Sequence, residues 1–365
     1  MKLVEFVPPT PHPLWELCPQ MGITDVVVKV NPDLTGMPDP WRYETLAAIV
    51  GRLESAGLNV VGLEGDPFDM RPIKEFGVDI RNGQDARCPS REEALAHYRE
   101  LLESMGKLGI KLLCYNFMVG KGWSRTGVRE GRGGAKATFF SLDEFLTGFT
   151  RFTGLKEIGA MPTEPDNPVN PVNPVQEKLL LSHELVWANY EHFIKAVMPT
   201  AEKFGIRMGL HPDDPCLDSL GGYARIFGSV EAYDRAYALY PSPSNAVTFC
   251  QANFKLMGVD LEKTARHFGK RIAFIHIRDV EGNKTDFTEL FHDQGDTDQF
   301  ALMRTYREIG LDVPVRGDHV PEMAYDRILT RDGTPGYFTL GRLFANGYLK
   351  ALLQGTEDAA QTWID

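Results

Sequence analysis

Short runs of apolar and β-branched residues recur along the 365-residue chain and alternate with longer segments of helical spacing. Strands of a parallel sheet are buried on both faces, so they appear as nearly continuous apolar runs, and helices connect them. Eight runs have this character: LVEFV (3–7), DVVVKV (25–30), NVVGLEG (59–65), IKLLCYNF (110–117), IRMGLH (206–211), AVTFC (246–250), IAFIHIR (272–278) and VPVRGD (313–318). Eight is the strand number of a TIM barrel, so we predict an α/β fold with one (β/α)8 domain over residues 1–365.

The segments between these runs carry signals for helix ends. Ser90 and Glu93 have the spacing of a capping box. Apolar residues follow at helical spacing, and Gly109 stands where a C-terminal cap is expected. Residues 338–354 are predicted to form the last barrel helix. A helix that ends at a glycine just before a strand is typical of the connections in a barrel.

One long insertion, residues 118–180, interrupts the repeat between the fourth and fifth predicted strands. It contains a glycine-rich stretch (127–136), a predicted helix around Phe139–Phe152 and the repeat PDNPVNPVNPV (165–175). Proline cannot continue a helix or a central strand, so the repeat predicts a surface connector. A lid or an oligomer arm over the barrel mouth is the alternative, because long barrel loops often serve as lids.

Composition restricts the class of function. The chain has 50 acidic and 39 basic residues and a net charge of −11, which disfavours nucleic-acid binding. Its five cysteines include no CxxC pair, as expected in a reducing compartment. The N-terminal stretch has prolines where a signal peptide needs an apolar run, and no stretch approaches the ~20 apolar residues of a membrane span. We therefore expect a cytoplasmic protein that binds neither nucleic acid nor membrane.

Residue types that ligate metals mark the ends of the last four predicted strands: His211, Cys250, His276 and Asp318. All strands of a parallel barrel end on one face, where active sites lie. Each residue alone has an ordinary explanation, as a buried apolar thiol, a hydrogen-bonded imidazole or a helix cap. Four of them at equivalent positions predict one metal site at the barrel mouth.

Further polar residues follow the same strands. Asp213 and Asp214 come after the fifth predicted strand, Arg278 ends the seventh, and the segment 291–300 carries His292. Loop carboxylates are most often solvated or bound to helix ends. Asp213, Asp214 and His292 have a second interpretation, in which they orient the metal ligands from behind.

Several strings, in this order along the chain, resemble the signature segments of the mannonate dehydratase family: CYNFM (114–118), HPDDP (211–215), FIHIRD (274–279), FHDQGDTD (291–298), RGDH (316–319) and PGY…GRL (335–343). The resemblance implies a xylose-isomerase-like barrel with a divalent metal, Mn²⁺ or Fe²⁺. It places the ligands on the same four residues that strand position selected. It also implies that D-mannonate loses water to give 2-keto-3-deoxy-D-gluconate, a step of hexuronate catabolism.

The resemblance further implies roles for residues around the metal. Removal of the C2 proton needs a general base and departure of the C3 hydroxyl needs a general acid. His319 and Tyr337 are the expected acid–base pair, in an order that the sequence leaves open. Four residues are expected to bind the substrate: Arg278, His292, Asn116 and Asp213. We expect a small sugar acid as the partner and a homo-oligomer, a dimer or larger.

Other functions stay open at this point. A sugar isomerase or epimerase on the same barrel also needs a metal and proton transfer but releases no water, and Cys250 argues against it because many such sites use only oxygen and imidazole ligands. A dehydratase for a different aldonate keeps the same chemistry. A non-catalytic sugar-acid-binding protein has no need of a metal set beside His319 and Tyr337.

Overall fold

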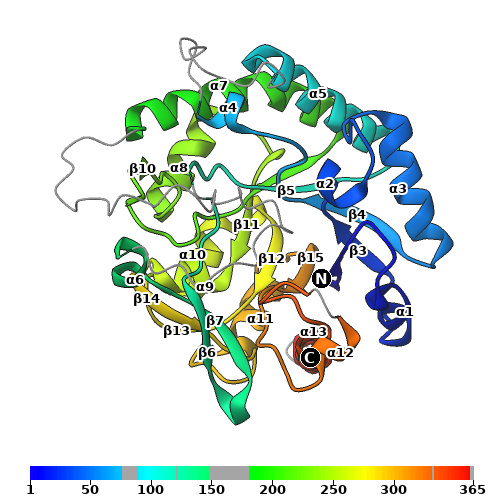
Figure 1. Cartoon of the computed structure of the whole chain (residues 1–365), viewed down its shortest axis with the longest axis vertical. Coiled ribbons are helices and arrows are strands. Elements are labelled where there is room, and N and C mark those ends of the chain that lie inside the picture. The colour runs from blue at the N-terminus through cyan, green and yellow to red at the C-terminus, as the bar shows by residue number, and fades with distance from the viewer. Residues whose placement is uncertain (76–88, 121, 148–180, 331–332, 362–365) are drawn as a thin grey trace.

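The computed structural model describes residues 1–75, 89–120, 122–147, 181–330 and 333–361, with side chains up to residue 357. In these ranges nine parallel strands form one sheet, in the order β1 (Lys2–Leu3), β15 (Pro314–Gly317), β12 (Ile272–Ile277), β11 (Asn245–Cys250), β8 (Arg207–Leu210), β5 (Leu112–Tyr115), β4 (Asn59–Glu64), β3 (Asp25–Val28) and β2 (Glu5–Val7). Only Val4 separates β1 from β2, so both ends of the sheet belong to one stretch of chain and the sheet closes into a barrel (Figure 1). The eight predicted strands are confirmed, the first of them in two pieces.

A helix of eight residues or more follows each strand of the barrel except β1, which leads directly into β2: α1 (Pro13–Gln20), α3 (Tyr43–Ser55), α5 (Arg91–Lys107), α7 (His183–Phe204), α8 (Val230–Leu239), α10 (Leu261–Phe268), α11 (Gln299–Glu308) and α13 (Thr339–Gln361). Five short helices lie within the connections: α2 (Pro32–Thr35), α4 (Arg71–Lys74), α6 (Leu142–Leu146), α9 (Gln251–Leu256) and α12 (Asp326–Leu329). The predicted capping box forms at α5, and the predicted last helix is α13. Within the described part of the chain, no helix combines the length and apolar character needed to cross a membrane.

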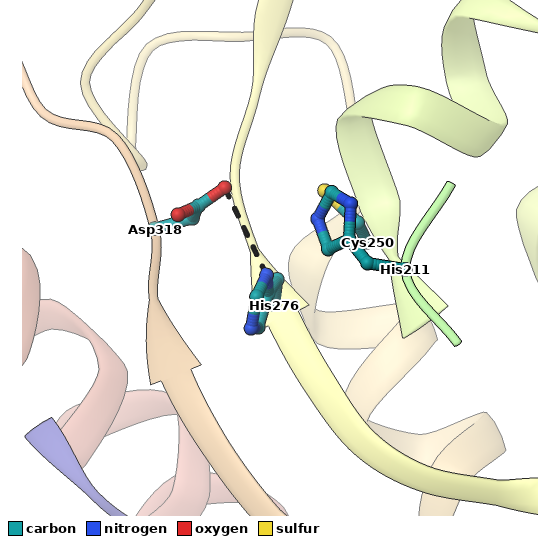
Figure 2. Close-up of side chains that lie close together, drawn as sticks. All are labelled: His211, Cys250, His276 and Asp318. Atoms are coloured by element: carbon teal, nitrogen blue, oxygen red, sulfur yellow. Dashed lines mark ion pairs between the residues drawn. The ribbon is translucent and has the colours of Figure 1, made fainter. Parts of the chain in front are cut away.

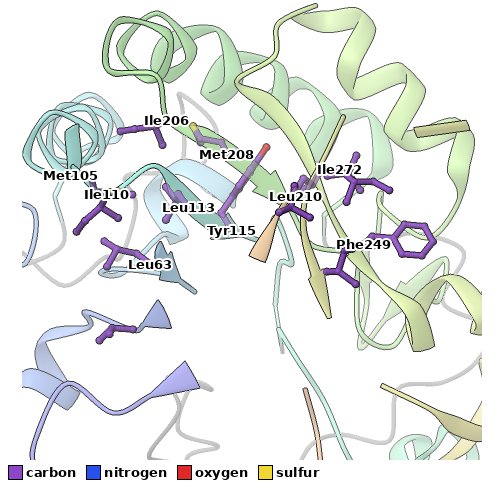
Figure 3. Close-up of a cluster of buried hydrophobic side chains, with 14 of the residues drawn as sticks. Leu63, Met105, Ile110, Leu113, Tyr115, Ile206, Met208, Leu210, Phe249 and Ile272 are labelled. Carbon is purple, nitrogen blue, oxygen red and sulfur yellow. The ribbon is translucent and has the colours of Figure 1, made fainter. Parts of the chain in front are cut away.

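The apolar core has two layers because successive strand residues point to opposite sides. Side chains such as Leu113 and Met208 face the outer helices, where Met105 and its neighbours cover them (Figure 3). The barrel interior holds a smaller cluster: Val4, Val27, Leu112, Cys114, Ala246, Ala273 and Phe274. This interior plug leaves the carboxyl ends of the strands as the place where polar side chains gather.

The predicted insertion pairs with a second excursion of the chain. β6 (Gly127–Glu130) and β7 (Lys136–Ser141) form a hairpin, and β7 pairs antiparallel with β14 (Asp286–Glu289), which pairs with β13 (Val280–Asn283). The prediction of a helix around Phe139–Phe152 is therefore wrong for its first residues, and a helix, α6, begins only at Leu142. The segment forms a strand instead of a helix because pairing with β14 places Phe140 opposite Phe287, with ring centroids 5.9 Å apart.

Two other elements complete the described fold. β9 (Ser219–Leu220) and β10 (Tyr223–Ala224) form a small antiparallel pair after β8. The Pro-Asn repeat at 165–175 lies outside the described residues.

Two helical glycines give a matched test of the packing between α5 and α7. A Cβ atom on Gly106 would lie 2.4 Å from Cδ1 of Phe204, whereas a Cβ on Gly51, within α3, would meet nothing within 4 Å. Alanine is intrinsically favoured over glycine in a helix by about 1 kcal/mol, and overpacking costs about 1–3 kcal/mol. We expect Gly106→Ala to lower the urea midpoint of unfolding and Gly51→Ala to raise it slightly. A Gly106→Ala protein as stable as Gly51→Ala would contradict this packing.

Candidate active site

The four residues predicted as metal ligands converge at the barrel mouth. They come from four strands that are adjacent in the sheet, β8, β11, β12 and β15, or from the residue just after them. One potential ligand atom from each lies within 4.8 Å of the others: His211, Cys250, His276 and Asp318 (Figure 2). All but His211 are buried. The structure thus brings together the set that strand position selected, and their role as ligands stays a prediction.

The two histidines have the hydrogen-bonding state that a metal site needs. His211 Nδ1 donates to the carbonyl oxygen of Pro212 at 2.8 Å, which leaves its Nε2 with a free lone pair. Both ring nitrogens of His276 are buried and have no hydrogen-bond partner among the described residues. A buried polar atom without a partner costs about 1–3 kcal/mol, and a bound cation would remove that cost at one nitrogen. This donor set of imidazole, thiol and carboxylate suits a divalent transition metal.

Asp318 is oriented so that one oxygen is held and the other faces the cluster. Its Oδ1 accepts from Arg316 Nη2 at 2.9 Å and lies 3.4 Å from the Tyr337 hydroxyl oxygen, while Oδ2 lies 3.8 Å from His276 Nδ1. Burial alone would raise the pKa of Asp318, but the neighbouring His319 and Arg316 outweigh burial and hold the pKa well below its usual range. The carboxylate is therefore anionic.

A second group of potential ligands, Glu64, Cys114 and His276, shares one histidine with the first. Arg316 donates to both Glu64 oxygens, at 3.0 and 2.5 Å, and places a positive charge beside this group. Burial raises the pKa of Cys114 well above its usual range, so its sulfur is a neutral thiol. These features disfavour a second cation. Glu64 Oε2 instead lies 3.6 Å from His276 Nε2, while the other ring nitrogen, Nδ1, lies 3.8 Å from Asp318 Oδ2.

The predicted acid–base pair lies beside Asp318. His319 Nε2 and the Tyr337 hydroxyl are 3.0 Å apart, and His319 Nδ1 is 3.1 Å from Glu289 Oε1. A carboxylate oxygen only accepts, so Nδ1 carries the proton of this bond and Nε2 faces Tyr337. Burial, and then the charge of Asp318, raise the pKa of Tyr337 well above its usual range. The phenol is therefore a proton donor.

Arg278 is enclosed, which is not the position expected of a substrate-binding residue. Its side chain has 0% exposure and donates to both oxygens of Glu289 at 2.7 Å and to Asp214 at 2.8 Å. It also donates to Asn253 Oδ1 at 2.7 Å, and that oxygen accepts from the Cys250 thiol at 2.9 Å. Asn253 thus connects Arg278 to Cys250, and binding of substrate by Arg278 stays a prediction.

The other three residues predicted to bind substrate also have protein partners. His292 is buried, its Nε2 donates to the carbonyl oxygen of Ile277 at 2.7 Å, and burial lowers its pKa. Asp213 is buried and accepts from the backbone of Phe227 at 2.8 Å. Asn116 Oδ1 accepts from Lys74 Nζ at 3.0 Å. For His292 and Asp213 these contacts favour the alternative interpretation, in which they orient neighbouring groups.

A buried network of two arginines and two carboxylates joins the insertion to the barrel. Arg125, from the insertion, bonds Asp214 through both terminal nitrogens at 2.7 and 2.9 Å, and Glu289 at 2.7 Å. Arg278 bonds the same two carboxylates from the other side. Burial would raise the pKa of Glu289, but the two arginines and His319 lower it to about 2. No sequence pattern pointed to Arg125 or Glu289, whereas Glu64 is the last residue but one of the third predicted strand, close to the strand ends that carry the candidate ligands.

This network predicts a specific dependence of stability on pH. An unfolded glutamate has a pKa near 4.3, so the stabilisation that comes from the low pKa of Glu289 is complete above that pH. It is lost as the pH falls from about 4 to about 2. We expect Glu289→Gln to be less stable than the wild type at pH 7 and to lose less of its stability on acidification. Urea unfolding from pH 7 to pH 2.5 measures this, with exposed Glu308→Gln as the control. Equal pH dependence of Glu289→Gln and wild type would contradict the assignment.

Comparison with known proteins identifies the family to which the chain belongs. The family model for D-mannonate dehydratase matches residues 15–363. Mannonate dehydratase of Streptococcus equi subsp. zooepidemicus is 28% identical over 325 residues, which are 88% of this chain and 85% of that protein. The crystal structure of mannonate dehydratase from Streptococcus suis serotype 2 matches with a TM-score of 0.77 at 25% identity and covers 99% of this chain and 96% of that one. A solved L-ribulose 3-epimerase, at 10% identity and a TM-score of 0.55, shares the fold over 100% of this chain and 99% of its own. The chain therefore belongs to the D-mannonate dehydratase family.

Proposed function

We propose that the protein is a metal-dependent hydro-lyase that converts D-mannonate to 2-keto-3-deoxy-D-gluconate and water. One observation carries the proposal: the candidate ligand set and the acid–base pair meet at Asp318. The Tyr337 hydroxyl lies 3.4 Å from Asp318 Oδ1 and 3.0 Å from His319 Nε2. A substrate oxygen bound beside Asp318 would therefore lie close to both proton-transfer groups. Membership of the family supports the choice of reaction and substrate.

His211, Cys250, His276 and Asp318 would hold the divalent cation. When bound, it supplies a Lewis acid for the substrate carboxylate and C2 oxygen, which makes the C2 proton easier to remove. Imidazole and carboxylate suit Mn²⁺, while the thiolate of Cys250 is a softer ligand that favours Fe²⁺. Both metals therefore belong in the test of activity.

The hydrogen bonds favour one assignment of the acid and the base. His319 donates its Nδ1 proton to Glu289, so Nε2 has the lone pair that accepts the C2 proton. Tyr337, a protonated phenol, donates its proton to the C3 hydroxyl as that group leaves as water. The proton on His319 then returns to the Tyr337 oxygen across their 3.0 Å contact, and the enol product tautomerises to the 2-keto acid.

The direct test is turnover of C5 and C6 aldonates, D-mannonate included, by chelator-stripped protein with added Mn²⁺ or Fe²⁺. The readout is formation of 2-keto-3-deoxy acid. Product from D-mannonate supports the proposal in full. Product from another aldonate alone keeps the reaction and changes the substrate. An isomer or epimer that retains the elements of water would replace the proposal with an isomerase.

Substitution of the acid–base pair separates proton transfer from metal binding. We expect His319→Ala and Tyr337→Phe each to lower kcat by at least about 10²-fold, because general acid–base catalysis typically contributes 10²–10⁴-fold. Metal content by elemental analysis should stay at the wild-type level. His192→Ala, at an exposed histidine that contacts Glu92, is the matched control and should keep full activity. Near-wild-type turnover in both active-site variants, with metal bound, would exclude this assignment.

Substitution of the candidate ligands gives a readout independent of turnover. We expect Cys250→Ser, His276→Ala and Asp318→Asn to bind at least about tenfold less tightly to Mn²⁺ or Fe²⁺, because each removes or weakens one donor. His267→Ala, at an exposed histidine paired with Asp234, should bind metal like the wild type. Metal titration followed by elemental analysis measures the difference, and circular dichroism checks that each variant is folded. Unchanged affinity in the folded ligand variants would place the metal elsewhere.

A further inference from the structure

Trp123 belongs to the insertion, and its surroundings fix it firmly beside the active site. The carbonyl oxygen of Gly122 accepts from Arg225 Nη2 at 2.6 Å, and the Ser124 N–H donates to the Asp214 carbonyl oxygen at 3.2 Å. The Arg125 guanidinium lies over the indole, 4.7 Å from the ring centroid, and is itself held by two buried carboxylates. The backbone on both sides of Trp123 and one face of its ring are therefore anchored by groups that are bonded to the barrel.

The indole lies against the acid–base pair. Its ring centroid is 5.1 Å from that of His319, and the two planes are inclined by 52°. The indole Nε1 is buried and has no hydrogen-bond partner among the described residues. This nitrogen can only donate, and a buried donor that has no acceptor costs free energy. A tryptophan kept solely for packing would more often bond this N–H to a nearby carbonyl group.

We propose that Trp123 Nε1 donates a hydrogen bond to a hydroxyl oxygen of the bound sugar acid, on C4, C5 or C6. This inference rests on the proposed function, which assigns the carboxylate and C2 oxygens to the cation and the C3 oxygen to Tyr337. The remaining oxygens of a six-carbon aldonate are those beyond C3. Trp123 is then a specificity-determining residue: it recognises the polyol chain, while the barrel residues act on C2 and C3.

A purely structural role predicts a different pattern. If Trp123 only holds the His319 ring in place, its loss would impair every substrate to the same extent. If it bonds one hydroxyl, its loss would matter only for substrates that carry that hydroxyl. The two roles are therefore separated by combining a protein variant with deoxy substrates, as in a double-mutant cycle.

The experiment compares wild type and Trp123→Phe, which keeps an aromatic ring and removes the N–H. Trp187→Phe is the matched control, because the Trp187 ring, in α7, packs against Tyr190 and Phe227 rather than against His319. Metal-loaded proteins are assayed for kcat/KM on D-mannonate and on its 4-deoxy, 5-deoxy and 6-deoxy analogues. We expect Trp123→Phe to lower kcat/KM on D-mannonate by about five- to tenfold, the effect of one neutral hydrogen bond. On the one deoxy analogue that lacks the bonded hydroxyl, Trp123→Phe and the wild type should have the same kcat/KM. Trp187→Phe should match the wild type on all four compounds.

The other outcomes overturn the inference in distinguishable ways. An unchanged kcat/KM in Trp123→Phe excludes the hydrogen bond. An equal loss on all three deoxy analogues replaces it with a packing role. If the wild type turns over no aldonate, the proposed function fails, and affinities for the same four compounds, from quenching of indole fluorescence, replace kcat/KM in the cycle. If the wild type also binds none of them, both proposals fall.

Discussion

Two arginines buried at the ends of neighbouring strands organise the site. Arg316, in β15, bonds Glu64 and Asp318, and Arg278, just after β12, bonds Asp214, Glu289 and Asn253. Each arginine bonds two carboxylates, and each contacts a group next to or within the candidate ligand set: Arg316 bonds Asp318, and Arg278 bonds Asn253, which accepts from Cys250. The placement of the imidazole, thiol and carboxylate donors follows from these contacts.

Buried ion pairs of this kind contribute more to the positions of the side chains than to the free energy of folding. Removing two charges from water carries a desolvation cost that their attraction often only offsets. These contacts hold the side chains of the site in the arrangement that the reaction requires. A site of this kind loses activity when the residues that support it no longer fix its side chains. Glu64 illustrates the point: both of its oxygens are bonded by Arg316, and one of them also faces His276.

The barrel and the convergence of His211, Cys250, His276 and Asp318 followed from the sequence because both depend on local pattern. Apolar runs identify buried strands, and parallel strands end on one face. The pairing of β7 with β14 did not follow, because the partner of Phe140 lies almost 150 residues further along the chain. Arg278 was expected to bind substrate, since sequence position places it near the mouth but does not show which neighbours enclose it. The contacts of Trp123 and Arg125 could not be predicted for a similar reason, because they depend on how the insertion packs against the barrel.

The mixed origin of the site has a consequence for how its specificity can change. The candidate ligands lie at the ends of barrel strands or just after them, whereas Trp123 comes from a connection whose hairpin is joined edge to edge with another connection (Figure 1). Connections of this kind vary between relatives more readily than strands do. The proposed contact of Trp123 with the sugar chain therefore lies on a different part of the fold from the candidate metal ligands. A different substrate specificity can arise when this connection is replaced by another segment. The new segment must then supply a positively charged side chain that bonds Asp214 and Glu289, as Arg125 does.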